Sequence, residues 1–232
     1  MSSNSLLVAN PGRAPRATIA YEWLKGRLLS GHYAFGEELQ LVGIAKEVAV
    51  SRQPVMEAVK RLQLEGFVEI IPQVGCRVAV PSQEDAEDLF EVFATLEALV
   101  TRLAAERREP ADADELKAIA SRFEQLRAGA FKVDDYRRLN RDFHSAIHRL
   151  SRSVEGMRAA AAYWDRSDFL IATVGGEVGS GGELWADNLD NTVREHQQLA
   201  DAIIRGDGAA AGACAYQHIR SFGDVVLASL RT

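Results

Sequence analysis

The sequence has few of the features that mark secreted or membrane proteins. Only two cysteines occur in 232 residues, Cys76 and Cys214, and they fall in different predicted domains, so no disulfide framework is expected. No apolar run approaches the roughly eighteen residues of a membrane span. The first residues lack the basic and apolar regions of a signal peptide, and residues 1–15 are expected to form a flexible arm. These absences favour a protein of the reducing cytoplasm without membrane contact.

Positive charge is also scarce, and its distribution matters more than its total. The net charge is −6, which by itself argues against nucleic acid as a partner. Residues 1–82, however, carry nine Lys/Arg against seven Asp/Glu, whereas residues 83–232 carry eighteen against twenty-six. The small basic excess is therefore confined to the N-terminal third of the chain. A hydrophobic content of 47% is enough for a buried core in one large or two ordinary domains.

Residues 16–82 have the pattern of a winged helix-turn-helix domain. Apolar residues recur with helical spacing in residues 17–30, and a second, short helix is expected in residues 43–50. Ser51 is a suitable N-cap for a third helix, whose first turn tolerates Pro54. Two β-branched runs then flank the sequence PQVG and predict a hairpin. This order of elements is typical of a DNA-binding domain.

The third helix has the composition of a DNA-recognition helix. The N-terminal side chains of such a helix meet base edges and phosphates in the major groove. Arg52 can bind guanine in a bidentate manner, Gln53 can pair with adenine, and Ser51 can reach a phosphate. Lys60 lies further along for contact with the DNA backbone, and the hairpin tip is short enough to enter a minor groove. The alternative interpretation is that Arg52 and Gln53 are merely exposed residues at a helix start.

Beyond Pro81-Ser82 the sequence predicts only helices, and the fold class is therefore mainly α. Five glycines in residues 174–182 form the one conspicuous break. Six helices of about twenty residues suit an antiparallel bundle, so residues 83–232 are expected to form a separate helical domain. The expected helices span residues 84–108, 112–128, 132–151, 154–173, 183–206 and 208–230.

Three histidines fall on inward faces of these helices. Asn140 and His144 lie one turn apart at the edge of an apolar stripe centred on Phe143. His196 and His218 are in register with the apolar positions of the last two helices. Neutral imidazole is a good ligand for zinc-like ions, so three inward histidines favour a metal ion or an anionic ligand. The alternative is a set of core histidines, each hydrogen-bonded to a neighbour.

Other polar residues near this face are weaker candidates. His148 lies one turn beyond His144 but is expected to face solvent, and Asp142 is expected to point away from the His144 face. Cys214, one turn before His218, could supply a thiolate ligand, although a small buried side chain is the simpler interpretation.

The N-terminal domain resembles that of GntR-family transcription regulators, whose usual pattern is roughly LAxxLGVSRTPVREALxRLxxEGLV followed by RGxxV. This chain has IAKEVAVSRQPVMEAVKRLQLEGFVEIIPQVGCRV. Gln53 replaces the usual Thr, Met56 replaces an Arg, and Val42 stands where Arg is frequent, so the resemblance implies an altered operator sequence. The residues expected to contact DNA are Ser51, Arg52, Gln53, Met56, Lys60, Gln73 and Gly75.

Residues 83–232 similarly resemble the FCD effector domain of the FadR subfamily, through LNRDFHSAI and EHQQLADAIIRGDGAAAGACAYQHI. Many such domains bind a divalent metal, often taken to be zinc or nickel, through an acidic or amide residue and three histidines. The resemblance places this ligand set on Asn140, His144, His196 and His218.

The resemblance also identifies an effector pocket. Phe93 stands where many relatives carry an Arg that faces the pocket, so a bulkier or partly apolar ligand is expected to replace a simple small carboxylate. Trp164 and Trp185 are candidates for lining this pocket, with packing in the core as the alternative.

These features predict a transcriptional repressor that binds a pseudo-palindromic double-stranded DNA operator as a homodimer and responds to a small metabolite, expected to be an organic acid. A metal-dependent enzyme is the first alternative, but EHQQL is not the zinc motif HExxH and no GxSxG nucleophile motif is present. A purely structural metal site, without an effector, is the second alternative.

Overall fold

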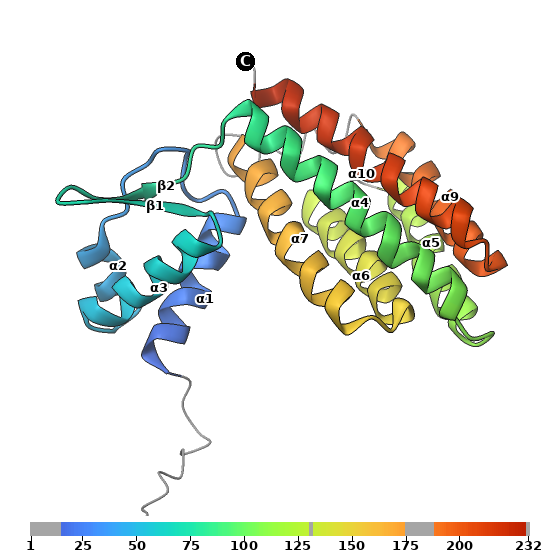
Figure 1. Ribbon diagram of the computed structural model, residues 1–232, viewed down its shortest axis with the longest axis horizontal. Helices are drawn as coiled ribbons and strands as arrows, with labels where there is room; N and C mark the ends of the chain where they lie inside the picture. The colour runs from blue at the N-terminus through green and yellow to red at the C-terminus, as the bar shows by residue number, and fades with distance from the viewer. Residues whose placement is uncertain (1–14, 130–131, 175–187, 231–232) are drawn as a thin grey trace, which may run out of the picture. The chain divides into compact units, whose positions relative to one another are not determined.

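The structure is a computed structural model that describes residues 15–129, 132–174 and 188–230 (Figure 1). The expected arm, residues 1–15, lies almost wholly outside the described residues. The chain divides into two compact units. The N-terminal unit extends to Arg27 and includes Gly36–Ala79, and the helical unit comprises Leu28–Phe35 and the chain from Val80 onward.

The N-terminal unit is a winged helix-turn-helix. Its helices are α1 (Arg16–Leu29), α2 (Leu41–Glu47) and α3 (Arg52–Leu64), followed by the strands β1 (Val68–Ile71) and β2 (Gly75–Val78). The two strands pair antiparallel, with Val68 opposite Val78. Helix α3 buries Val55, Val59 and Leu62 completely, and this apolar face fixes which residues of α3 remain on the surface.

The turn between α2 and α3 is a Schellman motif. The Val50 N–H donates to the Ala45 carbonyl (3.0 Å) and the Ala49 N–H donates to the Lys46 carbonyl (3.2 Å), so two of the last carbonyls of α2 are satisfied. The motif requires a left-handed residue after the helix, and Ala49 adopts it with φ of 57°. An L-residue pays about 1–2 kcal/mol for this conformation.

Replacing Ala49 by glycine is therefore expected to stabilise the protein by roughly 0.5–1 kcal/mol, because glycine avoids the steric cost but loses more backbone entropy on folding. Urea unfolding would measure the change. Ala45→Gly is the matched control, since glycine within helix α2 is expected to destabilise by about 1 kcal/mol. Equal destabilisation by both substitutions would contradict strain at Ala49.

The helical unit contains every helix beyond residue 82 that the structure describes. Helices α4 and α10 lie side by side along much of their length (Figure 1). Gly212 permits this approach, because a Cβ there would lie 3.1 Å from the Ala98 carbonyl oxygen. The six helices are α4 (Gln83–Arg107), α5 (Asp112–Ala128), α6 (Val133–Ser151), α7 (Val154–Val174), α9 (Leu189–Arg205) and α10 (Gly208–Leu230).

The predicted fold class is confirmed, and the boundaries of the described helices beyond residue 82 agree within about one residue except for α9. The short helix expected in residues 43–50 instead spans Leu41–Glu47, because the turn that follows it already begins at Val48. The expected helix 183–206 begins at Leu189 in the described part of the chain, and residues 183–187 lie outside it. Ser82 begins α4 with a capping box, in which the Asp85 N–H donates to the Ser82 hydroxyl and the Ser82 N–H donates to the Asp85 carboxylate. Among the described residues, no helix is both long and apolar enough to cross a membrane.

Candidate metal centre and nucleic-acid interface

Three helices of the helical unit bring together His144 of α6, His196 of α9 and His218 of α10, which we call the histidine cluster. One candidate ligand atom from each residue lies within 4.8 Å of those from the other two. All three side chains are buried, and Nε2 of His196 lies 3.4 Å from Nε2 of His144. The three inward histidines expected from helical periodicity therefore meet at one point.

Asn140 lies one turn before His144 on α6 and is also buried. Its side-chain oxygen has no hydrogen-bond partner, which is costly for a buried polar atom unless something else occupies that position. Asn140 lines a small cavity together with His218. The oxygen is thus available to an ion or a ligand beside the histidine cluster.

A carboxylate hydrogen-bonds to one of the three imidazoles, and a second carboxylate lies near another without a hydrogen bond. Nδ1 of His218 lies 2.8 Å from a Glu195 carboxylate oxygen, and Nδ1 of His144 lies 3.6 Å from a Glu97 carboxylate oxygen. A carboxylate on Nδ1 favours the tautomer that leaves Nε2 without a proton, as in carboxylate–histidine–metal triads. Nε2 of His218 is therefore a good electron-pair donor for the cluster.

Glu97 is the functional candidate that the sequence analysis missed. It is 1% exposed. Its Oε1 accepts a hydrogen bond from the Trp164 indole N–H (3.1 Å) and also lies 2.7 Å from Nε2 of His148. Burial raises the pKa of Glu97, but the charge and hydrogen bonds of His148 and His144 outweigh it and lower the pKa to about 2. Its position on the apolar face of the predicted helix, four residues after Phe93, was a signal that could have identified it.

The expected exposure of His148 is wrong. This side chain is buried at 9% exposure, because Glu97 on the neighbouring helix α4 provides a hydrogen-bond partner inside the protein. Periodicity within α6 places His148 beside the apolar stripe but contains no information about an acid on another helix. Asp142, by contrast, is half exposed and lies 3.7 Å from Arg122, and Cys214 is a half-buried free cysteine.

Two members of the histidine cluster, His144 and His196, are neutral at physiological pH because their pKa values are lowered. Burial lowers the pKa of His144 to about 4, although Glu97 opposes the shift. Burial and the neighbouring His218 and His144 lower the pKa of His196 well below its ordinary value. Metal ions bind the unprotonated imidazole, so these two ligands need not lose a proton when a metal binds.

The donor set fits an ion of the zinc or nickel type. Two nitrogens bound to one tetrahedral zinc at about 2.0–2.1 Å lie about 3.3 Å apart, close to the 3.4 Å between His144 and His196. Imidazole suits both metals, whereas an amide oxygen such as that of Asn140 is a weaker ligand than a carboxylate. A hydrogen bond between two neutral imidazoles is the alternative explanation of the same distance.

Two of the three residues predicted to form the effector pocket line a cavity, and the third lies outside the described residues. Phe93 and Trp164 line the small cavity that also contains Asn140 and His218, which we call the inner cavity. Its volume is about 20 Å³, enough for one water molecule. Trp185 lies outside the described residues. Other lining residues are Tyr136, Ser167, Ile171, Thr192, Ile219 and Phe222.

In the N-terminal unit, the predicted DNA-contacting residues lie on the surface of α3 and the hairpin. Ser51, Arg52, Gln53 and Lys60 are exposed, and Met56 is half-buried. Ser51 occupies the N-cap position, but its side chain forms no capping hydrogen bond, so the hydroxyl is available for a phosphate.

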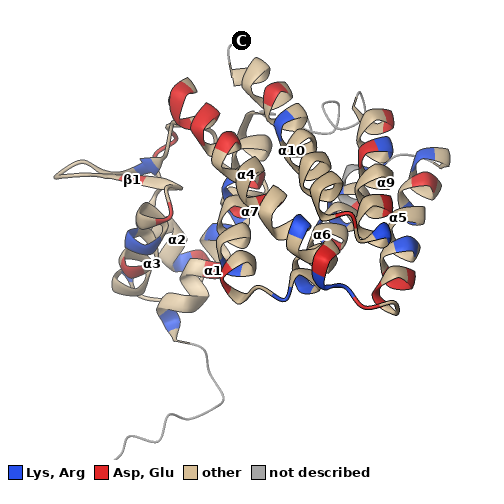
Figure 2. Ribbon diagram, turned by 45° about the vertical axis from the view of Figure 1, so that its right-hand side comes forward, with Lys and Arg blue, Asp and Glu red and all other residues tan. Residues whose placement is uncertain are grey.

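The hairpin tip is exposed at both predicted contact residues, Gln73 and Gly75. Gln73 adopts a left-handed conformation with φ of 64°. The tip sequence, residues 72–75, contains no charged side chain, and the hairpin tip is tan in Figure 2. Any contact of this tip with DNA would therefore depend on shape and hydrogen bonds more than on charge.

A winged helix-turn-helix in a chain that also carries an all-helical domain defines a class of DNA-binding transcription regulators. Comparison with protein families agrees with this class. Residues 17–78 match the bacterial regulatory proteins of the gntR family, and residues 88–221 match the FCD domain. The chain therefore belongs to the GntR family of transcription regulators and carries an FCD domain, a family that is not a class of enzymes.

The chain is similar to named transcription regulators over most of their length. The chain is 29% identical over 208 residues to the HTH-type transcriptional repressor GlaR of Escherichia coli K12. The matched region covers 86% of this chain and 90% of that protein. It is 25% identical over 217 residues to the HTH-type transcriptional regulator LutR of Bacillus subtilis, covering 85% and 94%. The solved structure of E. coli McbR/YncC has a TM-score of 0.73 at 19% identity, covering 92% of this chain and 98% of that one, and supports the fold.

Proposed function

We propose that this protein is a repressor whose operator affinity depends on a small organic acid bound beside a divalent metal ion. A cytoplasmic homodimer would place two recognition helices on a pseudo-palindromic DNA site, because symmetric regulators of this kind bind two half-sites. Residues 16–82 would contact the DNA, and residues 83–232 would bind metal and effector and form the dimer. The name of the relative GlaR, a repressor, supports this direction of control.

The convergence of three buried imidazoles is the observation that carries the proposal. Core packing alone gives no reason for His144, His196 and His218 to meet from three separate helices. His218 has a carboxylate hydrogen-bonded to Nδ1, an arrangement that favours metal binding through Nε2. The free oxygen of Asn140 supplies a fourth donor or a hydrogen-bond acceptor at the same place.

A zinc or nickel ion would supply a positive charge that anchors the carboxylate of the effector. The inner cavity is too small for an organic acid of several heavy atoms, so binding would require Phe93 of α4 or Trp164 of α7 to move. These two rings contact each other edge to face, with centroids 5.2 Å apart. Their displacement would transmit effector binding to α4, the first helix after the DNA-binding domain.

The proposal predicts that metal and effector act together on DNA binding. A duplex selected from a random library with the protein itself would serve as the operator, and its affinity would be measured with a panel of organic acids at fixed salt. At least one acid is expected to change operator affinity by about 5- to 150-fold, the usual range of allosteric coupling, when zinc or nickel is present. After treatment with a chelator the same acid should have no effect.

Three other outcomes would overturn this function. If the metal raises the melting temperature but no acid changes melting or operator affinity, the metal is structural. If an acid acts equally well after chelation, the effector does not depend on the metal. Turnover of a substrate by the metal-loaded protein would instead indicate an enzyme.

A further inference from the structure

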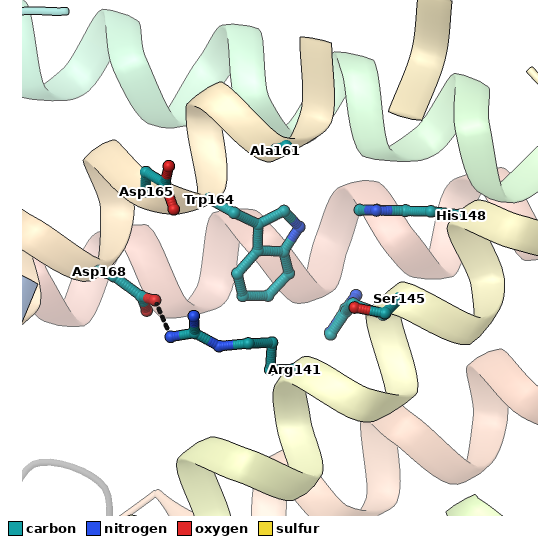
Figure 3. Close-up of a pocket in the computed structure, with 8 residues that line it drawn as sticks. Arg141, Ser145, His148, Ala161, Trp164, Asp165 and Asp168 are labelled. Atoms are coloured by element: carbon teal, nitrogen blue, oxygen red, sulfur yellow. Dashed lines mark hydrogen bonds and ion pairs between the residues drawn. The ribbon is translucent and has the colours of Figure 1, made fainter. Parts of the chain in front are cut away.

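A second pocket lies in the helical unit, between α6 and α7 (Figure 3). Arg141, Ser145 and His148 share one face of α6, at spacings of four and three residues. Trp164, Asp165 and Asp168 share the facing side of α7. We call this pocket the outer groove. Its free volume is about 170 Å³, comparable to a cavity of about 150 Å³ that holds benzene.

The outer groove is distinct from the inner cavity. Trp164 lines both. Asn140 and His218 line only the inner cavity, whereas Arg141, Asp168 and the His144 ring of the histidine cluster line only the outer groove. The Trp164 indole is held by its hydrogen bond to Glu97 and by the neighbouring His144 ring, with centroids 4.5 Å apart. A ligand in the outer groove can therefore bind without contacting the ligand nitrogens of His196 or His218.

Charges of both signs line the groove. Asp165 and Asp168 come from the same turn of α7, and Figure 3 shows both at the same end of the groove. Arg141 lies below them and pairs with Asp168 at 2.7 Å. Burial is the main reason that the pKa of Asp168 is raised, and the nearby charge of Asp165 adds to the shift. Arg141 and Arg137 oppose it. A cation placed against both carboxylates would relieve their mutual repulsion.

The same groove can also hold a carboxylate. The Arg141 side chain is 61% exposed, and its guanidinium carries five N–H donors on three nitrogens. One of these nitrogens, Nη2, pairs with Asp168. The exposed Ser145 hydroxyl lies one turn along α6 from Arg141 and adds a donor. Arg141 can therefore keep its ion pair with Asp168 and still bind a ligand carboxylate. The Trp164 indole supplies an aromatic surface beside both groups, which favours a ligand ammonium.

We propose that the outer groove binds a small zwitterion of the α-amino-acid class, with its ammonium at Asp165 and Asp168 and its carboxylate at Arg141 and Ser145. The available volume accommodates about six to eight heavy atoms, the size of alanine or serine, by comparison with benzene in its cavity. This site adjoins the proposed metal centre through the His144 ring, but its ligand is held by residues of the groove outside the histidine cluster, so it does not rest on the proposed function. Its ligand needs both charged groups.

Calorimetric titration of the full chain with small α-amino acids, in the presence of a chelator, tests the site. At least one amino acid is expected to bind, and the matched acid and amine, propionate and ethylamine for alanine, are expected to bind about tenfold or more weakly. Asp168→Asn is expected to weaken binding by a similar factor. Asp165→Asn is expected to have the same effect, and it is included because Asp168 is partly buried and its replacement can also disturb folding.

Asp142→Asn is the matched control, because Asp142 is a half-exposed acid on α6 that pairs with Arg122 and does not line the groove. It should leave the affinity unchanged. The proposal fails if no amino acid binds, or if propionate alone binds as well as alanine. It also fails if binding requires metal and is lost in His196→Ala but not in the two aspartate variants. Metal retention, measured separately, tests the function proposed above.

Discussion

Replacing His196 by alanine is expected to abolish stable metal binding. His196 is 1% exposed and lies within ligand distance of both other histidines, so its loss leaves two imidazoles and a neutral amide oxygen. Removing an outer partner of a ligand alone typically reduces metal affinity 10- to 100-fold, and removal of a ligand itself should exceed this. Elemental analysis after dialysis would give one metal per chain for the natural sequence and essentially none for the variant. His218→Ala is expected to give the same result.

A graded series separates a metal centre from a packing defect. Glu195→Gln keeps a side chain of the same shape but removes the charge beside Nδ1 of His218, so metal affinity should fall about 10- to 100-fold without loss of the fold. Gln197→Ala changes an exposed residue of the same helix and should have no effect. Asn140→Asp should raise the affinity, because a carboxylate is the stronger ligand. Unchanged stoichiometry in His196→Ala would refute the ligand set.

The fold was accessible from the sequence because its signals are local. The six helices that the structure describes beyond residue 82 follow from apolar spacing, and the hairpin follows from two β-branched runs around PQVG. The inward direction of His144, His196 and His218 also follows from the periodicity of each helix. The resemblance to known regulators then connected these three residues with a metal, which periodicity alone could not distinguish from hydrogen-bonded core histidines.

The surroundings of the cluster were not accessible in this way, because they depend on contacts between helices. His148 was expected at the surface because its own helix places it beside the apolar stripe, yet Glu97 of α4 draws it inside. Glu97 lies fifty-one residues from its His148 partner, and no local pattern connects them. The volume of the inner cavity depends in the same way on how Phe93 and Trp164 pack together.

Replacing Arg52 by alanine is expected to remove specific operator binding and leave the helical unit folded. Arg52 is exposed in the first turn of α3, the turn that meets base edges when a recognition helix enters the major groove. A bidentate contact of arginine with guanine contributes about 1–3 kcal/mol to discrimination between bases, so specificity at one position should fall roughly 5- to 150-fold. Competition gel shifts at fixed salt, with the selected operator and with single-base variants, would measure this loss.

Lys60→Ala provides the contrasting control. Lys60 is exposed on the same helix and is expected to contact a phosphate, so its loss should weaken binding to all sequences about equally and reduce the slope of log affinity against log salt by about one. Gln63→Ala, an exposed change near the end of α3, should leave DNA binding unaltered. Because the hairpin tip carries no charge, little of the salt dependence should come from residues 72–75. Arg52 would then determine sequence preference and Lys60 part of the salt dependence, and retention of specific binding by Arg52→Ala would show that another surface reads the operator.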